Sequence, residues 1–237
     1  MTEADWLSSP DTSKLKRHLG HPLSRRKCLL AVCAYGLRVA QHVSIPGLVD
    51  HLREWEAKAD IVPLSPFTMD EVERQSNAMA PRGPMNFHTR GICLALNYLI
   101  FFATDAGSIG SNTPVGLRRE VVRVKCPAVR NIIERPEEFD PEARSIYTSE
   151  TAAFNNILWD IFGNPFRPVT LSPEWRTDTV LSMVKEMYQS RDFFAMPVLA
   201  DALQEAGCED ERVLEHCRGP GPHVRGCWVV DLLLGKE

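Results

Sequence analysis

The amino-acid sequence predicts an all-α, or nearly all-α, protein built as a compact bundle of about ten short helices. Apolar residues recur at helical spacing along most of the chain, and capping residues and seventeen prolines divide it into short segments. Apolar residues make up 44% of the 237 and charged residues 24%, a composition that can bury a core. We expect one domain, 1–237, with a possible subdivision into 1–106 and 113–237 at the polar loop 105–114.

In the N-terminal half, each expected helix begins at a capping residue or a proline. The starting residues are Asp11, Ser24, Pro46 and Thr68, and the helices end near Gly20, Gln41, Ala59 and Met79. The apolar run 92–103 predicts a buried helix rather than a membrane span, because a span needs about 20 residues. Residues 121–125, VVRVK, are the best strand candidate in the chain.

The strongest helix prediction begins at Asp140-Pro141 and ends at Gly163. Residues 164–168 contain two prolines and should be rigid and extended, since a proline disfavours helical backbone in the residue before it. Short helical segments are then expected at 172–174, 180–188, 196–206, 210–218 and 226–234.

The net charge of -4 gives no general attraction to nucleic acid, so we do not expect a nucleic-acid partner. Residues 12–49 carry seven Lys or Arg and no acid, and we expect the acidic parts of the fold to complement them. The N-terminus lacks the apolar region of an export signal. Seven cysteines without such a signal predict reduced thiols and a cytoplasmic location.

The C-terminal third carries three distinctive runs: DIFGNPFRPV (160–169), VLADALQEAGC (198–208) and HCRGPGPHVRGCWVVDLLLGKE (216–237). These runs resemble a family of uncharacterised proteins from planctomycete bacteria. The opening MTEADWL and the helix start at 24–27 are also similar to that family, whereas 60–150 depart from it. The resemblance implies a bacterial cytosolic protein and carries no activity, ligand or catalytic residue.

The residues with the most evident chemistry lie near the C-terminus. They are Cys208, His216, Cys217, His223 and Cys227. Four such donors could bind zinc, although the spacing differs from familiar zinc motifs and adjacent helical residues point to different sides. The alternative is that Cys217 and Cys227 pack in the core while His223 bonds to the backbone.

Arg218 and Arg225 flank the sequence Gly-Pro-Gly-Pro and are candidates for binding an anion. Because prolines donate no hydrogen bond, the segment is otherwise explained as a rigid chain reversal. No recognisable catalytic set occurs. The sequence therefore favours a helical binding or scaffold protein with a protein partner and without catalytic activity. The alternative is a metal-dependent or atypical enzyme with its site around 208–227.

Overall fold

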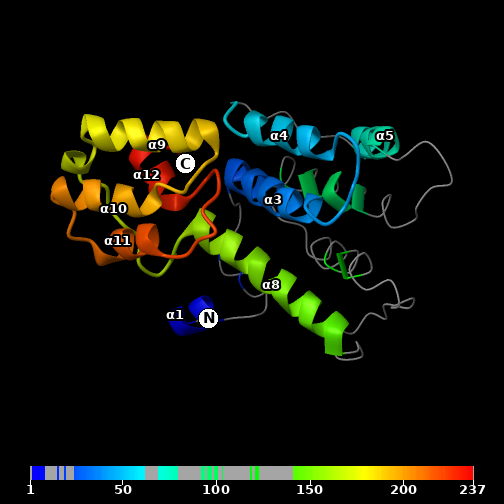
Figure 1. Cartoon of the computed structure of the whole chain (residues 1–237), viewed down its shortest axis with the longest axis horizontal. Helices are drawn as coiled ribbons and strands as arrows, with labels where there is room; N and C mark the ends of the chain where they lie inside the picture. The colour runs from blue at the N-terminus through cyan, green and yellow to red at the C-terminus, as the bar shows by residue number, and fades with distance from the viewer. Residues whose placement is uncertain are drawn as a thin grey trace. The chain divides into compact units, whose positions relative to one another are not determined.

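A computed structural model of the chain, shown in Figure 1, describes residues 2–8, 24–61, 69–79 and 141–236, together with 15, 19, 92–93, 95–97, 99–100, 103, 118 and 121–122. Every regular element in these residues is helical, and they contain no strand. The predicted all-α class is thereby confirmed for the described part of the chain.

The helices with defined bounds are short, apart from α8. They are α1 (Glu3–Ser8), α3 (Arg25–Ala40), α4 (Leu48–Lys58), α5 (Met69–Met79), α8 (Pro141–Phe162), the 3₁₀ turn η2 (Pro173–Trp175), α9 (Asp178–Ser190), α10 (Met196–Glu205), α11 (Glu211–Arg218) and α12 (Trp228–Leu234). The chain divides into an N-terminal unit, Met1–Asn155, and a C-terminal unit, Asn156–Glu237. The division lies inside α8.

In the N-terminal unit, α3 packs against α4 (Figure 1). Gly36 lies in the middle of α3, where a Cβ atom would stand 2.8 Å from Leu52 Cδ2 and 3.0 Å from Leu96 Cδ2. The missing side chain lets these leucines approach the backbone of α3. As predicted, most of α3 is buried, from Cys28 to Val39.

An ion pair joins α3 to the first part of α8. Arg38 Nε donates to Glu150 Oε2 at 3.0 Å, and Arg38 Nη2 donates to Glu150 Oε1 at 3.1 Å. The Glu150 side chain has no exposed surface. A buried carboxylate is costly without a partner, so this two-pronged pair is needed to keep Glu150 inside.

Two predictions in this unit are wrong. Val121 and Val122 are helical and fully buried, because apolar β-branched residues also suit the buried face of a helix. The second helix of the pair starts at Leu48, after Gly47 at a φ of 75°, and not at Pro46. The predicted cap at Asp11 and the loop 105–114 lie outside the described residues.

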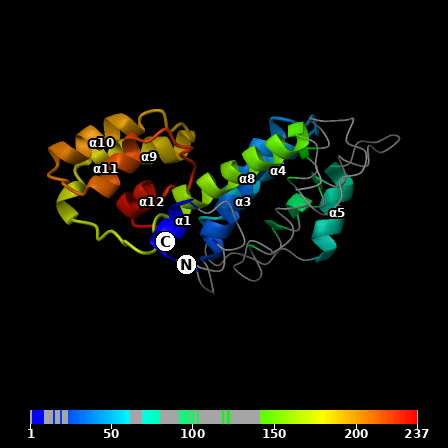
Figure 2. The ribbon, with the colours of Figure 1, turned by 90° about the horizontal axis from the view of Figure 1, so that it is seen from below.

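In the C-terminal unit, α10 lies beside α9 and α11, and α12 packs against α9 and α11 (Figures 1 and 2). These helices close on one apolar core. Its fully buried members include Val180, Val184, Met196, Leu199, Leu203, Cys208, Cys217, Cys227 and Val229. Two predicted helix ends are confirmed. The Asp210 carboxylate caps the start of α11 by accepting from the Arg212 N–H at 3.0 Å, and Gly163, with a φ of 66°, follows the end of α8.

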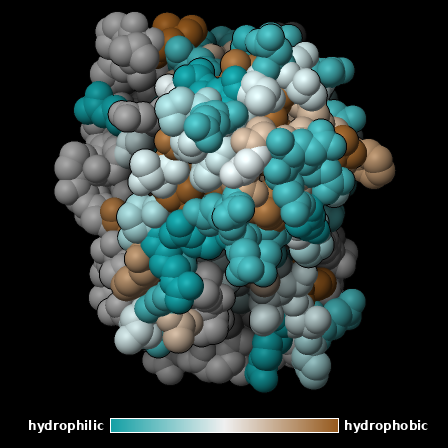
Figure 3. Space-filling model, turned by 90° about the vertical axis from the view of Figure 1, so that its left-hand side faces the viewer, coloured by the Kyte–Doolittle hydropathy of each residue, from teal (hydrophilic) through white to brown (hydrophobic). Residues whose placement is uncertain are grey.

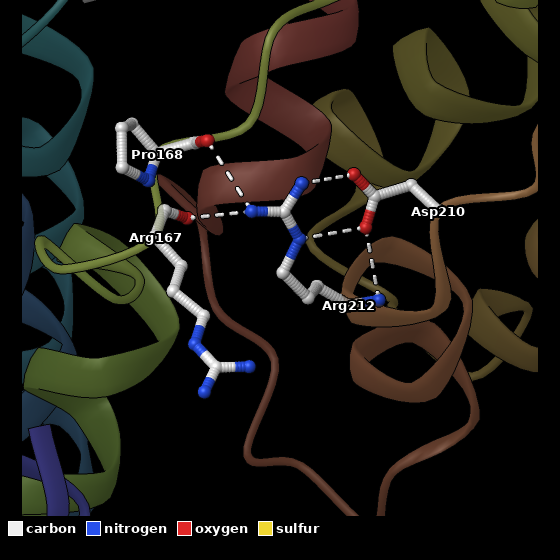
Figure 4. Close-up of polar contacts among 4 residues, drawn as sticks. All are labelled: Arg167, Pro168, Asp210 and Arg212. Carbon is white, nitrogen blue, oxygen red and sulfur yellow. Dashed lines mark hydrogen bonds and ion pairs between the residues drawn. The ribbon is translucent and has the colours of Figure 1, made fainter.

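The segment between α8 and η2 is held by Arg212 (Figure 4). Its guanidinium pairs with the Asp210 carboxylate and donates to the carbonyl oxygens of Arg167 and Pro168 at 3.3 and 3.4 Å. The predicted extended conformation of 164–168 is wrong for 164–167, because the Arg167 N–H donates to Asn164 O at 3.2 Å and closes a turn.

The described helices include none whose length and apolar character would let it cross a bilayer. Figure 3 shows one face of the molecule, and its coloured surface is mostly hydrophilic, with hydrophobic areas small and separate.

Candidate metal centre

Four side chains of the C-terminal unit bring metal-binding atoms together. Asp160, His216, His223 and Cys227 each offer one ligand atom, and these atoms all lie within 4.8 Å of one another. The set contains one carboxylate, two imidazoles and one thiol. Asp160 is 3% exposed and Cys227 is fully buried, so most of the cluster is shielded from water.

Different elements deliver the four residues. Asp160 lies near the end of α8, on the same face as the buried Ile157 and Ile161. His216 is in the last turn of α11, and Cys227 immediately precedes α12. The cluster therefore lies where three helices of the unit meet.

His223 reaches the cluster from the loop between α11 and α12, which two glycines shape. Gly221 and Gly226 have φ values of 75° and 98°, in the left-handed region that side chains disfavour. A Cβ on Gly221 would also stand 2.9 Å from His223 N. The loop therefore needs glycine at 221 to present the imidazole in this position.

Asp160 is the centre of the polar contacts. Its Oδ1 lies 3.0 Å from His223 Nδ1 and 3.2 Å from His216 Nε2. Its Oδ2 accepts a hydrogen bond from Val224 N–H at 2.9 Å. An ionised carboxylate only accepts hydrogen bonds, so Nδ1 of His223 carries the hydrogen when no metal is bound.

The Nε2 atom of His216 lies at the same distance from two different atoms. Asp160 Oδ1 and Cys227 Sγ are each 3.2 Å away. A tetrahedral zinc ion with bonds of about 2.0–2.3 Å separates N and O ligands by about 3.3 Å and N and S ligands by about 3.5 Å. These two pairs need to open by only a few tenths of an ångström to accept such an ion, whereas any pair as far apart as 4.8 Å, the limit of the cluster, would have to close.

The charge states of the acid and the thiol follow from burial and from their neighbours. Burial acts to raise the pKa of Asp160, but the imidazoles of His216 and His223 outweigh it and hold the pKa below its usual value. Burial and the nearby Asp160 raise the pKa of the Cys227 thiol well above its usual value, against the N–H groups at the start of α12. Asp160 is thus ionised and Cys227 is a neutral thiol until a cation displaces its proton.

This donor set suits zinc better than the hard cations. Ca²⁺ and Mg²⁺ take oxygen ligands, whereas thiolate and imidazole together are typical of Zn²⁺. Four protein donors fill a tetrahedron, and a closed set of this kind is the rule in structural zinc sites. The Val224 N–H on Asp160 Oδ2 would orient the carboxylate from the outer shell.

Asp160, His216 and Cys227 do not have the geometry of a Cys-His-Asp catalytic triad. In a triad the thiol and the carboxylate contact opposite nitrogens of the imidazole. Here Asp160 and Cys227 both face Nε2 of His216. In addition, Cys227 has no exposed surface, and its raised pKa is the reverse of what a nucleophile requires.

Of the five predicted metal ligands, the structure brings three together: His216, His223 and Cys227. Cys208 and Cys217 lie fully buried in the apolar core and outside this group. His216 and Cys217 point to different environments, as adjacent helical residues should. The alternative interpretation is right that both Cys217 and Cys227 are buried in the core, but His223 Nδ1 faces the Asp160 carboxylate rather than the backbone.

Sequence reasoning missed Asp160, which lies 56 residues before His216. One signal was present in the sequence. Asp160 follows Ile157 by three residues and precedes Ile161, so it occupies the apolar face of the helix. An acid at such a position needs a buried partner, and the histidines near the C-terminus could supply it.

The two arginines predicted to hold an anion have separate partners. Arg218 Nη2 donates to Asp201 Oδ1 and Gln204 Oε1, both at 2.9 Å. The Arg225 guanidinium carbon lies 4.4 Å from the centre of the Tyr188 ring. Both arginines therefore contribute contacts within the unit.

Comparison of the chain with models of protein families, with curated proteins and with solved structures gives no match. The geometry of the four-residue cluster is therefore the feature of this chain that bears most directly on function.

Proposed function

We propose that this chain is a zinc-binding helical protein. In this proposal, Asp160, His216, His223 and Cys227 hold one Zn²⁺ with a structural role. The observation that carries it is the approach of a carboxylate, two imidazoles and a thiol to within 4.8 Å in a buried position. The ion would link α8, α11 and the start of α12, and the protein would act by binding a partner.

A structural role is favoured over a catalytic one because the donor set is complete. Catalytic zinc sites use three protein ligands and keep a position for water or substrate. With four protein donors, the ion has no position at which to activate water. The proposal therefore favours the binding or scaffold interpretation over a metal-dependent enzyme.

The test is metal stoichiometry with a spectroscopic readout. The full chain is stripped with a chelator, dialysed against Zn²⁺ and analysed for bound metal, and we expect one equivalent. In a parallel sample Co²⁺ replaces Zn²⁺, and we expect the visible absorption of tetrahedral cobalt together with a thiolate-to-cobalt band in the near ultraviolet. The thiolate band should disappear in Cys227→Ser.

Matched variants separate the ligands from their neighbours. His216→Gln should lose stoichiometric zinc, whereas His51→Gln, which changes a histidine of the N-terminal unit, should keep it. Cys217→Ala should also keep one equivalent with an unchanged cobalt spectrum. Absence of zinc from the wild-type chain, or equal zinc in His216→Gln, would overturn the proposal.

A further inference from the structure

The connection between α9 and α10 presents an aromatic side chain to solvent. Phe194 is 92% exposed, and Val198 on the first turn of α10 is 58% exposed. The Phe194 N–H donates to Asp192 Oδ1 at 3.0 Å, and the neighbouring Phe193 is buried. An exposed phenylalanine on a backbone held in this way is typical of an anchor for a partner.

Phe194 does not make the contact that its position would ordinarily allow. A hydrophobic residue just before the helix cap commonly packs against the fourth residue of the helix. Here the cap residue is Ala195 and the fourth residue is Leu199, which is fully buried. Phe194 instead stays in solvent, so its apolar surface is available to another chain.

The exposed positions continue along α10 at coiled-coil spacing. Val198, Asp201 and Glu205 are separated by three and four residues along the helix and are exposed, and the exposed Phe194 lies in the turn two residues before α10 begins. This is the spacing at which one helix contacts another along a seam. The seam is apolar at Val198 and acidic at Asp201 and Glu205, and the turn that carries Phe194 precedes its apolar end.

Charge decides what can lie on this seam. Asp201 forms an ion pair with Arg218. The three acidic residues Asp192, Asp201 and Glu205 nevertheless make the surroundings of the seam more acidic than basic. The whole C-terminal unit, residues 156–237, carries thirteen Asp or Glu and eight Lys or Arg. A second copy placed seam to seam would bring acidic groups together, which is unfavourable.

We propose that the exposed face of Phe194 and α10 binds a basic amphipathic helix of a partner protein. That helix places apolar residues against Phe194 and Val198, and Lys or Arg against Asp201 and Glu205. This surface includes none of the four metal ligands, so the inference does not depend on the zinc proposal.

The probe is a labelled helical peptide with Leu at two successive seam positions and Lys at the next two. The control is the same peptide with Glu in place of Lys. We expect the full chain to bind the Lys peptide in a fluorescence anisotropy titration, and binding to weaken as salt increases. The Glu peptide should bind at least tenfold more weakly.

Variants locate the binding on the chain. Phe194→Ser should weaken binding of the Lys peptide at least tenfold and should fold normally, because Phe194 is exposed. Ile61→Ser, which changes an exposed apolar residue of the N-terminal unit, should leave binding unchanged. Equal binding in Phe194→Ser, equal binding of both peptides, or no binding at about 1 mM peptide would overturn the proposal. So would a dimer that Phe194→Ser dissolves, since it would identify a second copy as the occupant.

Discussion

The substitution Asp160→Asn tests the polar centre of the C-terminal unit most directly. The amide has nearly the shape of the carboxylate but no charge, and its NH₂ group cannot accept a hydrogen bond. Hydrogen bonds to a charged group contribute about 1.5–3 kcal/mol each, against about 0.5–1.5 kcal/mol for neutral ones. Weakening the contacts to His216, His223 and Val224 should therefore cost the metal-free unit about 2–3 kcal/mol.

Zinc should enlarge the difference, because it stabilises only the chain that binds it. Free zinc at 100 to 1,000 times its dissociation constant adds about 2.7–4.1 kcal/mol to the folded wild type. Asparagine is a poor zinc ligand, so the variant should gain little. The total difference in the free energy of unfolding then reaches about 5–7 kcal/mol.

Amide hydrogen exchange measured by mass spectrometry reads this unit separately from the rest of the chain. Without metal, peptides from α11 and α12 should exchange about 30- to 150-fold faster in Asp160→Asn, since each factor of ten corresponds to about 1.4 kcal/mol. The control is Asp201→Asn, which removes an exposed carboxylate and should change protection little. Unchanged protection in Asp160→Asn, or an equal response to zinc in both chains, would refute the reasoning.

The same pair of proteins should differ in acid. The pKa of Asp160 is lowered in the folded state, so the unfolded chain takes up a proton first as the pH falls. The ionised Asp160 carboxylate stabilises the fold fully at pH values above its pKa in the unfolded chain, about 3.9. This stabilisation is lost as the pH falls through the lower pKa of Asp160 in the folded chain. In the metal-free wild type, α11 and α12 should therefore lose protection from amide hydrogen exchange below about pH 5. The Asp160→Asn chain should not show this pH-dependent loss.

Three further predictions concern packing and burial. Arg38→Met should destabilise the N-terminal unit by about 3–5 kcal/mol, because it removes the two-pronged guanidinium partner of the buried Glu150 carboxylate and leaves the longer contact to His42 Nε2 at 3.8 Å. Arg38→Met with Glu150→Met should recover most of that loss in a urea titration. Gly163→Ala should cost about 1–2 kcal/mol, since it places a side chain at a φ of 66° and 3.2 Å from Trp228 Cγ, and a thermal melt would show it. Thiol labelling of the native chain should modify at most Cys126, because the six other cysteines are buried, whereas all seven should react in denaturant.

Much of the fold could be predicted because its signals are local. The proline at 141 and the glycine at 163 bound α8, and the cap at Asp210 marks the start of α11. Such signals depend on a few neighbouring residues and on backbone geometry. The segment 121–122 was misassigned because β-branched residues favour a strand only in a sheet, and tertiary burial in a helix overrides that preference.

The candidate site could be predicted only in part because its geometry is not local. His216, His223 and Cys227 lie close in sequence, so their type and proximity gave a usable signal. Asp160 joins them through the packing of α8 on the unit, which no spacing rule describes. Cys217 shows the opposite error: it has the right chemistry and is adjacent to a ligand, but the direction of its side chain places it in the core.

The lengths of the last helices bear on why an ion would be needed. With eight and seven residues, α11 and α12 are shorter than the about 12–15 residues an isolated helix needs, so tertiary contacts must hold them. The apolar core supports one side of each, and the loop between them contributes mainly Gly and Pro. A hydrogen-bonded centre at Asp160 accounts for His223 and Val224, and without a metal Cys227 serves as a packed thiol of the apolar core. A zinc ion bound as proposed would use all four donors and would account for the approach of the oxygen and the sulfur to one nitrogen of His216.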